Sequence, residues 1–120
     1  MKIHTIQLGK WRRAKELGIE LIDTTVKSGE PEFAPSWEMV KGIKEGTLSE
    51  EEYTKQYIQL VKGSMIANRA KWEALIAKEE FALACYCKSG CFCHRYILKD
   101  IVSTVARTRG IPVEYCGEII

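Results

Sequence analysis

The sequence has no long hydrophobic run and no strong excess of charge of one sign. No apolar stretch approaches the ~18 residues of a membrane-spanning helix. The N-terminus also lacks the apolar block and the small-residue cleavage site of a signal peptide. The net charge is +2, from 18 basic and 16 acidic residues, which neither indicates nor excludes nucleic-acid binding. We therefore expect a cytoplasmic protein without a membrane partner.

The cysteines do not fit a disulfide framework. There are five of them, an odd number, and four lie between positions 85 and 93. Thiols stay reduced in the cytoplasm, so these side chains are candidate ligands, nucleophiles or small buried residues. The chain has 120 residues, of which 46% are hydrophobic, and can bury one core without a disulfide or a metal. We expect a single domain over residues 1–120.

Alternating strand and helix patterns predict an α/β fold. Strands are expected at 3–8, 19–26, 81–86 and 111–116, with helices at 10–17 and 96–107. Three further helices are expected between the second and third strands: two begin after the capping residues Ser36 and Ser49, and one spans 64–78. Such an order gives a mainly parallel sheet covered on both faces. The sequence thus predicts a small three-layer sandwich of about four strands with an all-helical insertion.

The segment 87–95 carries the strongest functional signal. It follows an apolar strand and leads into an amphipathic helix, so we expect a strand-to-helix loop. Such a loop directs backbone N–H groups and the positive end of a helix at one point, which suits an anion. Lys88, His94 and Arg95 add side-chain donors there. We therefore predict that the loop binds an anionic small molecule or a nucleotide.

Individual roles can be assigned as hypotheses. Arg95 would bind the anion, because its planar fork matches phosphate or carboxylate. His94 would act as acid, base or ligand, and Asp23, at a strand end, would orient a substrate or accept a proton. Cys87 and Cys93 are the candidate nucleophiles, with a thiolate favoured by the helix start. However, Arg95 follows Cys87 by more residues than in the cysteine-dependent phosphatases, which disfavours their mechanism.

A metal site is the less favoured interpretation of the same cluster. Its cysteines and His94 are soft ligands, of which zinc needs three or four in a tetrahedral array. Structural zinc sites usually combine two separated pairs of ligands, whereas these residues form one contiguous cluster. We assign no metal ligand from the sequence and identify no cofactor, and a zinc-stabilised domain stays as an alternative.

The chain resembles an uncharacterised family. Residues 85–95, Cys-Tyr-Cys-Lys-Ser-Gly-Cys-Phe-Cys-His-Arg, end in the Cys-His-Arg signature of the family called domain of unknown function 488. The stretches 23–29, 33–36 and 49–53 are similar to its short branch, which is often encoded by phages. The resemblance implies a small α/β sandwich but no established reaction. The positions that match are Asp23, Lys27, Cys87, Cys93, His94, Arg95 and Glu118.

Two interpretations of the function stay open. In the first, the protein binds a small anionic molecule or nucleotide at the loop from Cys87 to Arg95, with Lys27, Lys88 and Glu118 close by, and it is either an enzyme or a binding protein. In the second, it is a non-catalytic protein- or nucleic-acid-binding module of phage or prokaryotic origin. Its predicted helices would then carry the partner surface. The sequence decides neither the substrate nor the oligomeric state.

Overall fold

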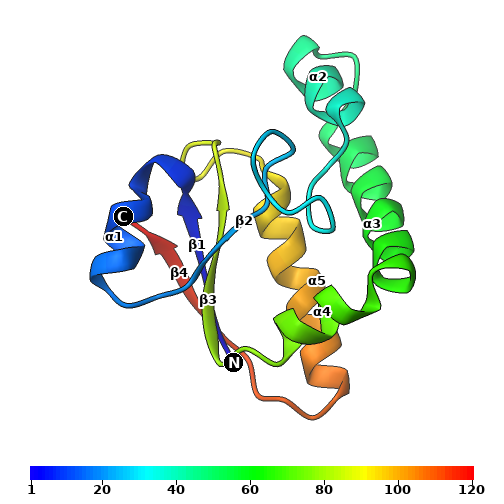
Figure 1. The fold of residues 1–120 in the computed structure, drawn as a ribbon. Coiled ribbons are helices and arrows are strands. Elements are labelled where there is room, and N and C mark those ends of the chain that lie inside the picture. The colour runs from blue at the N-terminus through cyan, green and yellow to red at the C-terminus, as the bar shows by residue number, and fades with distance from the viewer.

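Four strands form one parallel sheet at the centre of the computed structural model, which describes residues 1–120 (Figure 1). The strands are β1 (Lys2–Gln7), β2 (Leu21–Asp23), β3 (Glu80–Cys85) and β4 (Glu114–Ile119). Their order in the sheet is β2-β3-β1-β4, and each neighbouring pair is parallel. The predicted α/β fold with a parallel sheet is confirmed.

The helices are distributed unequally over the two faces of the sheet (Figure 1). One face is covered by the 3-10 turn η1 (Leu8–Lys10) and the short helix α1 (Trp11–Glu16), and the other by α5 (His94–Thr108). The insertion between β2 and β3 packs beside α5 and consists of α2 (Trp37–Glu45), α3 (Glu50–Ala67) and α4 (Arg69–Ile76). The predicted helical insertion is thus confirmed. None of these helices has both the length and the apolar character needed to cross a membrane.

Strand β3 separates the core into two parts of different size. Successive side chains of a strand point to opposite faces. Phe81 and Leu83 lie in the main cluster of 14 buried residues, which α5 and the insertion cover. Ala82 and Ala84 lie in a cluster of five, together with Ala14 of α1. The small side chains on this face let a two-turn helix approach the sheet closely, whereas the larger ones fill the volume beneath the insertion.

Two strands differ from their predicted extents for local reasons. The second was predicted over 19–26, but β2 ends at Asp23, whose carboxylate accepts hydrogen bonds from the backbone N–H and the hydroxyl of Thr25 (2.9 and 2.7 Å). This Asx-type turn takes the chain out of the ladder. The last strand was predicted over 111–116, whereas β4 begins at Glu114 and continues to Ile119. The predicted strand began too early because the apolar residues of this segment come before the residues that pair in the sheet.

The helix starts agree with the capping pattern, but one helix boundary was wrong. Ser36 accepts a hydrogen bond from the N–H of Met39 (3.2 Å), and Ser49 accepts one from Glu52 (3.1 Å). The helix predicted over 64–78 does not exist as one element, because α3 continues to Ala67 and the helical conformation is interrupted at Asn68 before α4 begins. The backbone of Asn68 is not helical there (φ −124°, ψ 44°).

Candidate functional site

The candidate site lies at the carboxyl end of the sheet, where β2 and β3 end side by side (Figure 1). The segment after β2 is fastened to β3 by Thr24, whose backbone N–H and hydroxyl both donate to the carbonyl of Ala84 (3.0 and 2.8 Å). The cysteine loop follows β3 directly, and α5 begins at His94. Ligands of open parallel sheets bind at this edge.

His94 is held in one protonation form by its neighbours. The side chain is buried (3% exposed), and Nε2 lies 2.9 Å from both the carbonyl and the hydroxyl oxygen of Thr24. The carbonyl can only accept a hydrogen bond, and the hydroxyl already donates to Ala84, so Nε2 carries the proton. Nδ1 faces the Sγ atoms of Cys85 and Cys93, each 3.8 Å away. Burial lowers the pKa of His94 to about 4, so the ring is neutral with a free Nδ1 lone pair at neutral pH.

Two cysteines contact this imidazole, and a third adjoins one of them. Cys85 ends β3 and Cys93 precedes α5, and both are buried, whereas Cys87 is exposed. The Sγ atoms of Cys85 and Cys87 are 3.9 Å apart. Hydrogen bonds from the other two thiols lower the pKa of Cys87 to about 2, whereas the same bonds raise the pKa values of Cys85 and Cys93. The thiol of Cys85 donates to Cys87 and thereby favours the thiolate form of Cys87.

Arg95 is fully buried and interacts with residues of its own chain. Its Nη2 lies 2.8 Å from Oε2 of Glu118 in β4, and Nε lies 3.4 Å from Oε1. Nη2 also donates to the hydroxyl of Tyr96 (3.0 Å) and the carbonyl of Lys88 (3.4 Å), while Nη1 has no partner. Burial alone lowers the pKa of Arg95, but the bond to the carboxylate outweighs it, and the net shift is upward. The guanidinium thus fastens the cysteine loop to β4.

The other predicted residues fall into two groups. Asp23 shapes the loop after β2, because it accepts hydrogen bonds from Thr25 and from the hydroxyl of Ser28 (2.7 Å). Lys27, on the same loop, is exposed and lines a pocket above the cysteines. Lys88 is also exposed but does not line this pocket. Of the predicted ligand-binding lysines, only Lys27 is therefore positioned to contact a molecule in it.

The pocket has a volume of about 450 Å³ and lies between the cysteine loop, the segment after β2 and the insertion. Lys27 and Lys44 are its only lysine or arginine residues, and no aspartate or glutamate lines it. Trp37 and Phe92 contribute aromatic surface. The lining residues are Thr25, Val26, Lys27, Pro35, Trp37, Val40, Ile43, Lys44, Tyr53, Cys85, Tyr86, Cys87, Phe92, Cys93 and His94.

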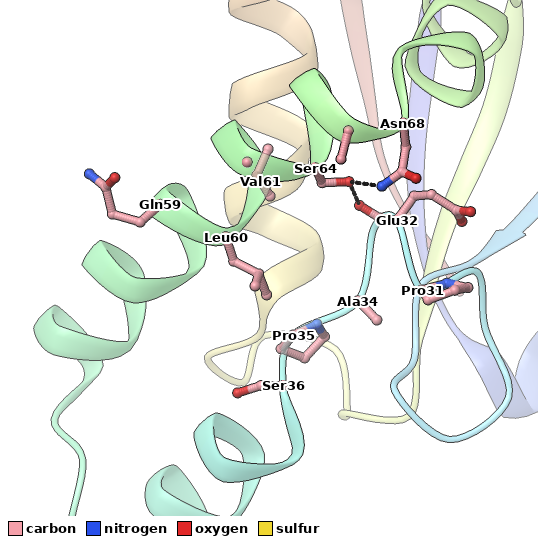
Figure 2. Close-up of a pocket in the computed structure, with 12 residues that line it drawn as sticks. Pro31, Glu32, Ala34, Pro35, Ser36, Gln59, Leu60, Val61, Ser64 and Asn68 are labelled. Atoms are coloured by element: carbon pink, nitrogen blue, oxygen red, sulfur yellow. Dashed lines mark hydrogen bonds between the residues drawn. The ribbon is translucent and has the colours of Figure 1, made fainter.

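A second hollow of about 490 Å³ lies on the other side of the loop 31–36, against α3 (Figure 2). The hydroxyl of Ser64 donates to the carbonyl of Glu32 (2.7 Å) and accepts from the side chains of Asn68 and Trp72 (3.2 and 3.0 Å). These bonds hold the loop against the helices. Neither cysteine nor histidine lines this hollow. Pro35 lines both hollows, so the loop is the wall between them.

Comparison with known families places the chain. The model of the family described as "Active DUF488-N3 subclade" matches residues 4–106. The chain belongs to the DUF488 family. The matched range contains the whole cysteine cluster and ends before Glu118. No curated protein and no solved structure matches the chain significantly.

In this DUF488 chain the structure brings together some of the predicted residues and separates others. Cys87, Cys93, His94 and Lys27 all line the pocket. Arg95 and Glu118, with Asp23 and Lys88, lie outside it. The contribution of α2 to the pocket was not predicted from the sequence. The signal that could have revealed it is the position of α2 in a helical insertion that directly follows the loop after β2.

Proposed function

We propose that this DUF488 protein binds a small molecule with an anionic group, of the nucleotide or phosphorylated-metabolite kind, in the pocket above the cysteine loop. The observation that carries the proposal is the charge of the lining: Lys27 and Lys44 are two basic side chains, no carboxylate lines the pocket, and the thiolate favoured at Cys87 is the one negative group there. The two lysines come from different elements, the loop after β2 and α2. An anionic group bound in the pocket would be attracted by both lysines.

The size and the walls of the pocket favour a molecule with a flat apolar part. Small-molecule sites usually occupy about 300–1,000 Å³, with mostly apolar walls and few polar groups. The volume of about 450 Å³ lies within this range. Trp37, Tyr86 and Phe92 supply aromatic rings that can pack against a base or another planar group.

The anion-binding role that the sequence gave to Arg95 is replaced in this proposal. Arg95 is neutralised by Glu118 and lies outside the lining. The backbone at the start of α5 and the side chains of Lys27 and Lys44 then provide the positive potential. His94 and Cys87 lie at the pocket wall, where they would contact a bound molecule. The proposal therefore concerns binding and assigns no catalytic step.

The proposal is tested by isothermal titration calorimetry with AMP, adenosine and inorganic phosphate at fixed ionic strength. We expect AMP to bind more tightly than adenosine. We expect Lys44→Ala to weaken AMP binding about fivefold, which corresponds to about 1 kcal/mol for one partly exposed charged contact. Adenosine binding should change little, because it has no anionic group.

Lys41→Ala is the matched control, since Lys41 is exposed on the same helix but does not line the pocket. If it weakens AMP binding as much as Lys44→Ala, the lysines act only through the overall charge, and the pocket is not the site. If none of the three probes binds, the nucleotide form of the proposal is wrong. The alternative of a macromolecular partner on the helical insertion would then gain support.

A further inference from the structure

We propose that Cys85, Cys87, Cys93 and His94 bind one zinc ion at the wall of the pocket. The four residues offer three sulfurs and one imidazole nitrogen, a ligand set typical of structural zinc. The ligand atoms of Cys85, Cys93 and His94 all lie within 4.8 Å of one another. Cys87 adjoins Cys85, with 3.9 Å between the two Sγ atoms.

Three of the six distances between the ligand atoms match the edges of a zinc tetrahedron. With Zn–S of about 2.3 Å and Zn–N of about 2.0–2.1 Å, tetrahedral geometry places two sulfurs about 3.8 Å apart, and a sulfur and a nitrogen about 3.6 Å apart. The observed edges are 3.9 Å for Cys85 to Cys87, and 3.8 Å from Nδ1 of His94 to the Sγ atoms of Cys85 and Cys93. Cys85, Cys93 and His94 are therefore already arranged as three ligands, and exposed Cys87 would move toward them to complete the set.

The orientation of His94 supports the same conclusion. Nε2–H is held by the carbonyl of Thr24, so the lone pair of Nδ1 points toward the sulfurs. In metal sites, a ligating histidine usually donates its other N–H to a carbonyl or carboxylate, which fixes the ring and its tautomer. The hydroxyl of Thr24 is itself anchored on Ala84 of β3. The outer contacts of a metal ligand are thus already in place.

The four proposed ligands lie on the two sides of one loop. Cys85 is the last residue of β3 and Cys87 lies in the loop two residues later, whereas Cys93 directly precedes α5 and His94 begins it. The intervening residues 88–91 are exposed and include Gly90 in the left-handed region (φ 82°), where glycine avoids a Cβ clash. In space the cluster is therefore two separated pairs joined by a tight turn. Three thiolates and an imidazole in a tetrahedral arrangement favour zinc over harder cations such as magnesium.

The first test measures metal content in protein expressed in zinc-supplemented medium and purified under reducing conditions. We expect one zinc per chain by native mass spectrometry and elemental analysis. After replacement by cobalt, we expect the absorption bands of tetrahedral cobalt and of thiolate-to-cobalt charge transfer. A parent protein that contains no zinc and takes up neither ion would overturn the proposal.

The variants compare cysteines inside and outside the cluster. Cys87→Ser changes an exposed ligand, so the fold should persist, and we expect zinc affinity to fall more than about 100-fold, because even the loss of an outer contact costs about 10–100-fold. Cys116→Ser removes an exposed cysteine from β4 and should keep one zinc. Equal zinc content and affinity in the two variants would contradict the assignment of Cys87.

A second readout needs no substitution. Three cysteines, Cys87, Cys91 and Cys116, are exposed and should all react with iodoacetamide in the metal-free protein. With zinc bound, we expect alkylation of Cys87 alone to slow markedly, as measured by peptide mass spectrometry. Unchanged alkylation of Cys87 at saturating zinc would count against it as a ligand. The proposal does not rest on nucleotide binding, because zinc content and AMP affinity are measured separately and can fail separately.

Discussion

Replacement of Glu118 by Gln should destabilise the protein strongly, because it leaves the guanidinium of Arg95 buried without a counter-charge. Arg95 is fully buried and Glu118 is only 12% exposed, so water can do little to replace the lost carboxylate. At the observed separation of 2.8 Å, an effective dielectric constant of about 20 gives an attraction of about 6 kcal/mol. Breaking a buried pair by removing one partner typically costs about 3–5 kcal/mol. Gln keeps one acceptor, so we expect about 3 kcal/mol.

Equilibrium unfolding in urea measures this cost. With a slope of about 1.5 kcal/mol/M, a loss of about 3 kcal/mol lowers the midpoint by about 2 M. Glu20→Gln is the matched control, because it removes the exposed pair of Glu20 with Lys78 (2.9 Å), and such pairs contribute less than about 1 kcal/mol. If Glu118→Gln costs no more than Glu20→Gln, Arg95 does not depend on its pair, and the structural role given to it here is wrong.

Two further predictions concern acid stability and backbone packing. Burial raises the pKa of Glu118, but the bonds from Arg95 outweigh this effect and lower the folded-state pKa. The stability advantage of the parent over Glu118→Gln should therefore be full above about pH 5 and shrink as the pH falls through the folded-state pKa. An advantage in urea unfolding that is unchanged at pH 3 would contradict this prediction. Gly29→Ala should destabilise by more than about 2 kcal/mol, since its Cβ would clash with the carbonyl oxygen of Asp23, whereas Gly63→Ala, in open space within α3, should stabilise by about 0.5–1 kcal/mol. Thermal shifts of the same sign for both variants would contradict the packing argument.

The fold could be predicted largely because β3 and α5 form a clear unit. An apolar run, a short loop and a helical stripe follow one another there, and each has its own period. The boundaries that failed depend on interactions that a local pattern does not contain. β2 ends early because the side chain of Asp23 binds the backbone of the next loop. The break at Asn68 interrupts an otherwise continuous helical pattern.

The candidate site was only partly predictable for a similar reason. The topology of a parallel sheet places residues after β2 and β3 at one edge, which brings Lys27 near His94. The partner of Arg95 depends on the position of β4 beside β1 and on the rotation of the first turn of α5. No spacing rule contains that information. The tertiary structure thus decides whether an arginine binds a ligand or a carboxylate of its own chain.

The proposed zinc ligands illustrate the limit of reasoning from spacing. The close spacing of the cysteines in the sequence disfavoured zinc, because structural zinc sites usually combine two separated pairs of ligands. A strand and a helix that meet at a sheet edge can supply two such pairs of ligands within a few residues, because the chain reverses direction between them. Here the reversal occurs at Gly90, and its consequence is that Cys85 and Cys93 face the same imidazole. A cluster at a strand-to-helix junction should therefore be judged by the elements that hold it and not by its spacing in the sequence.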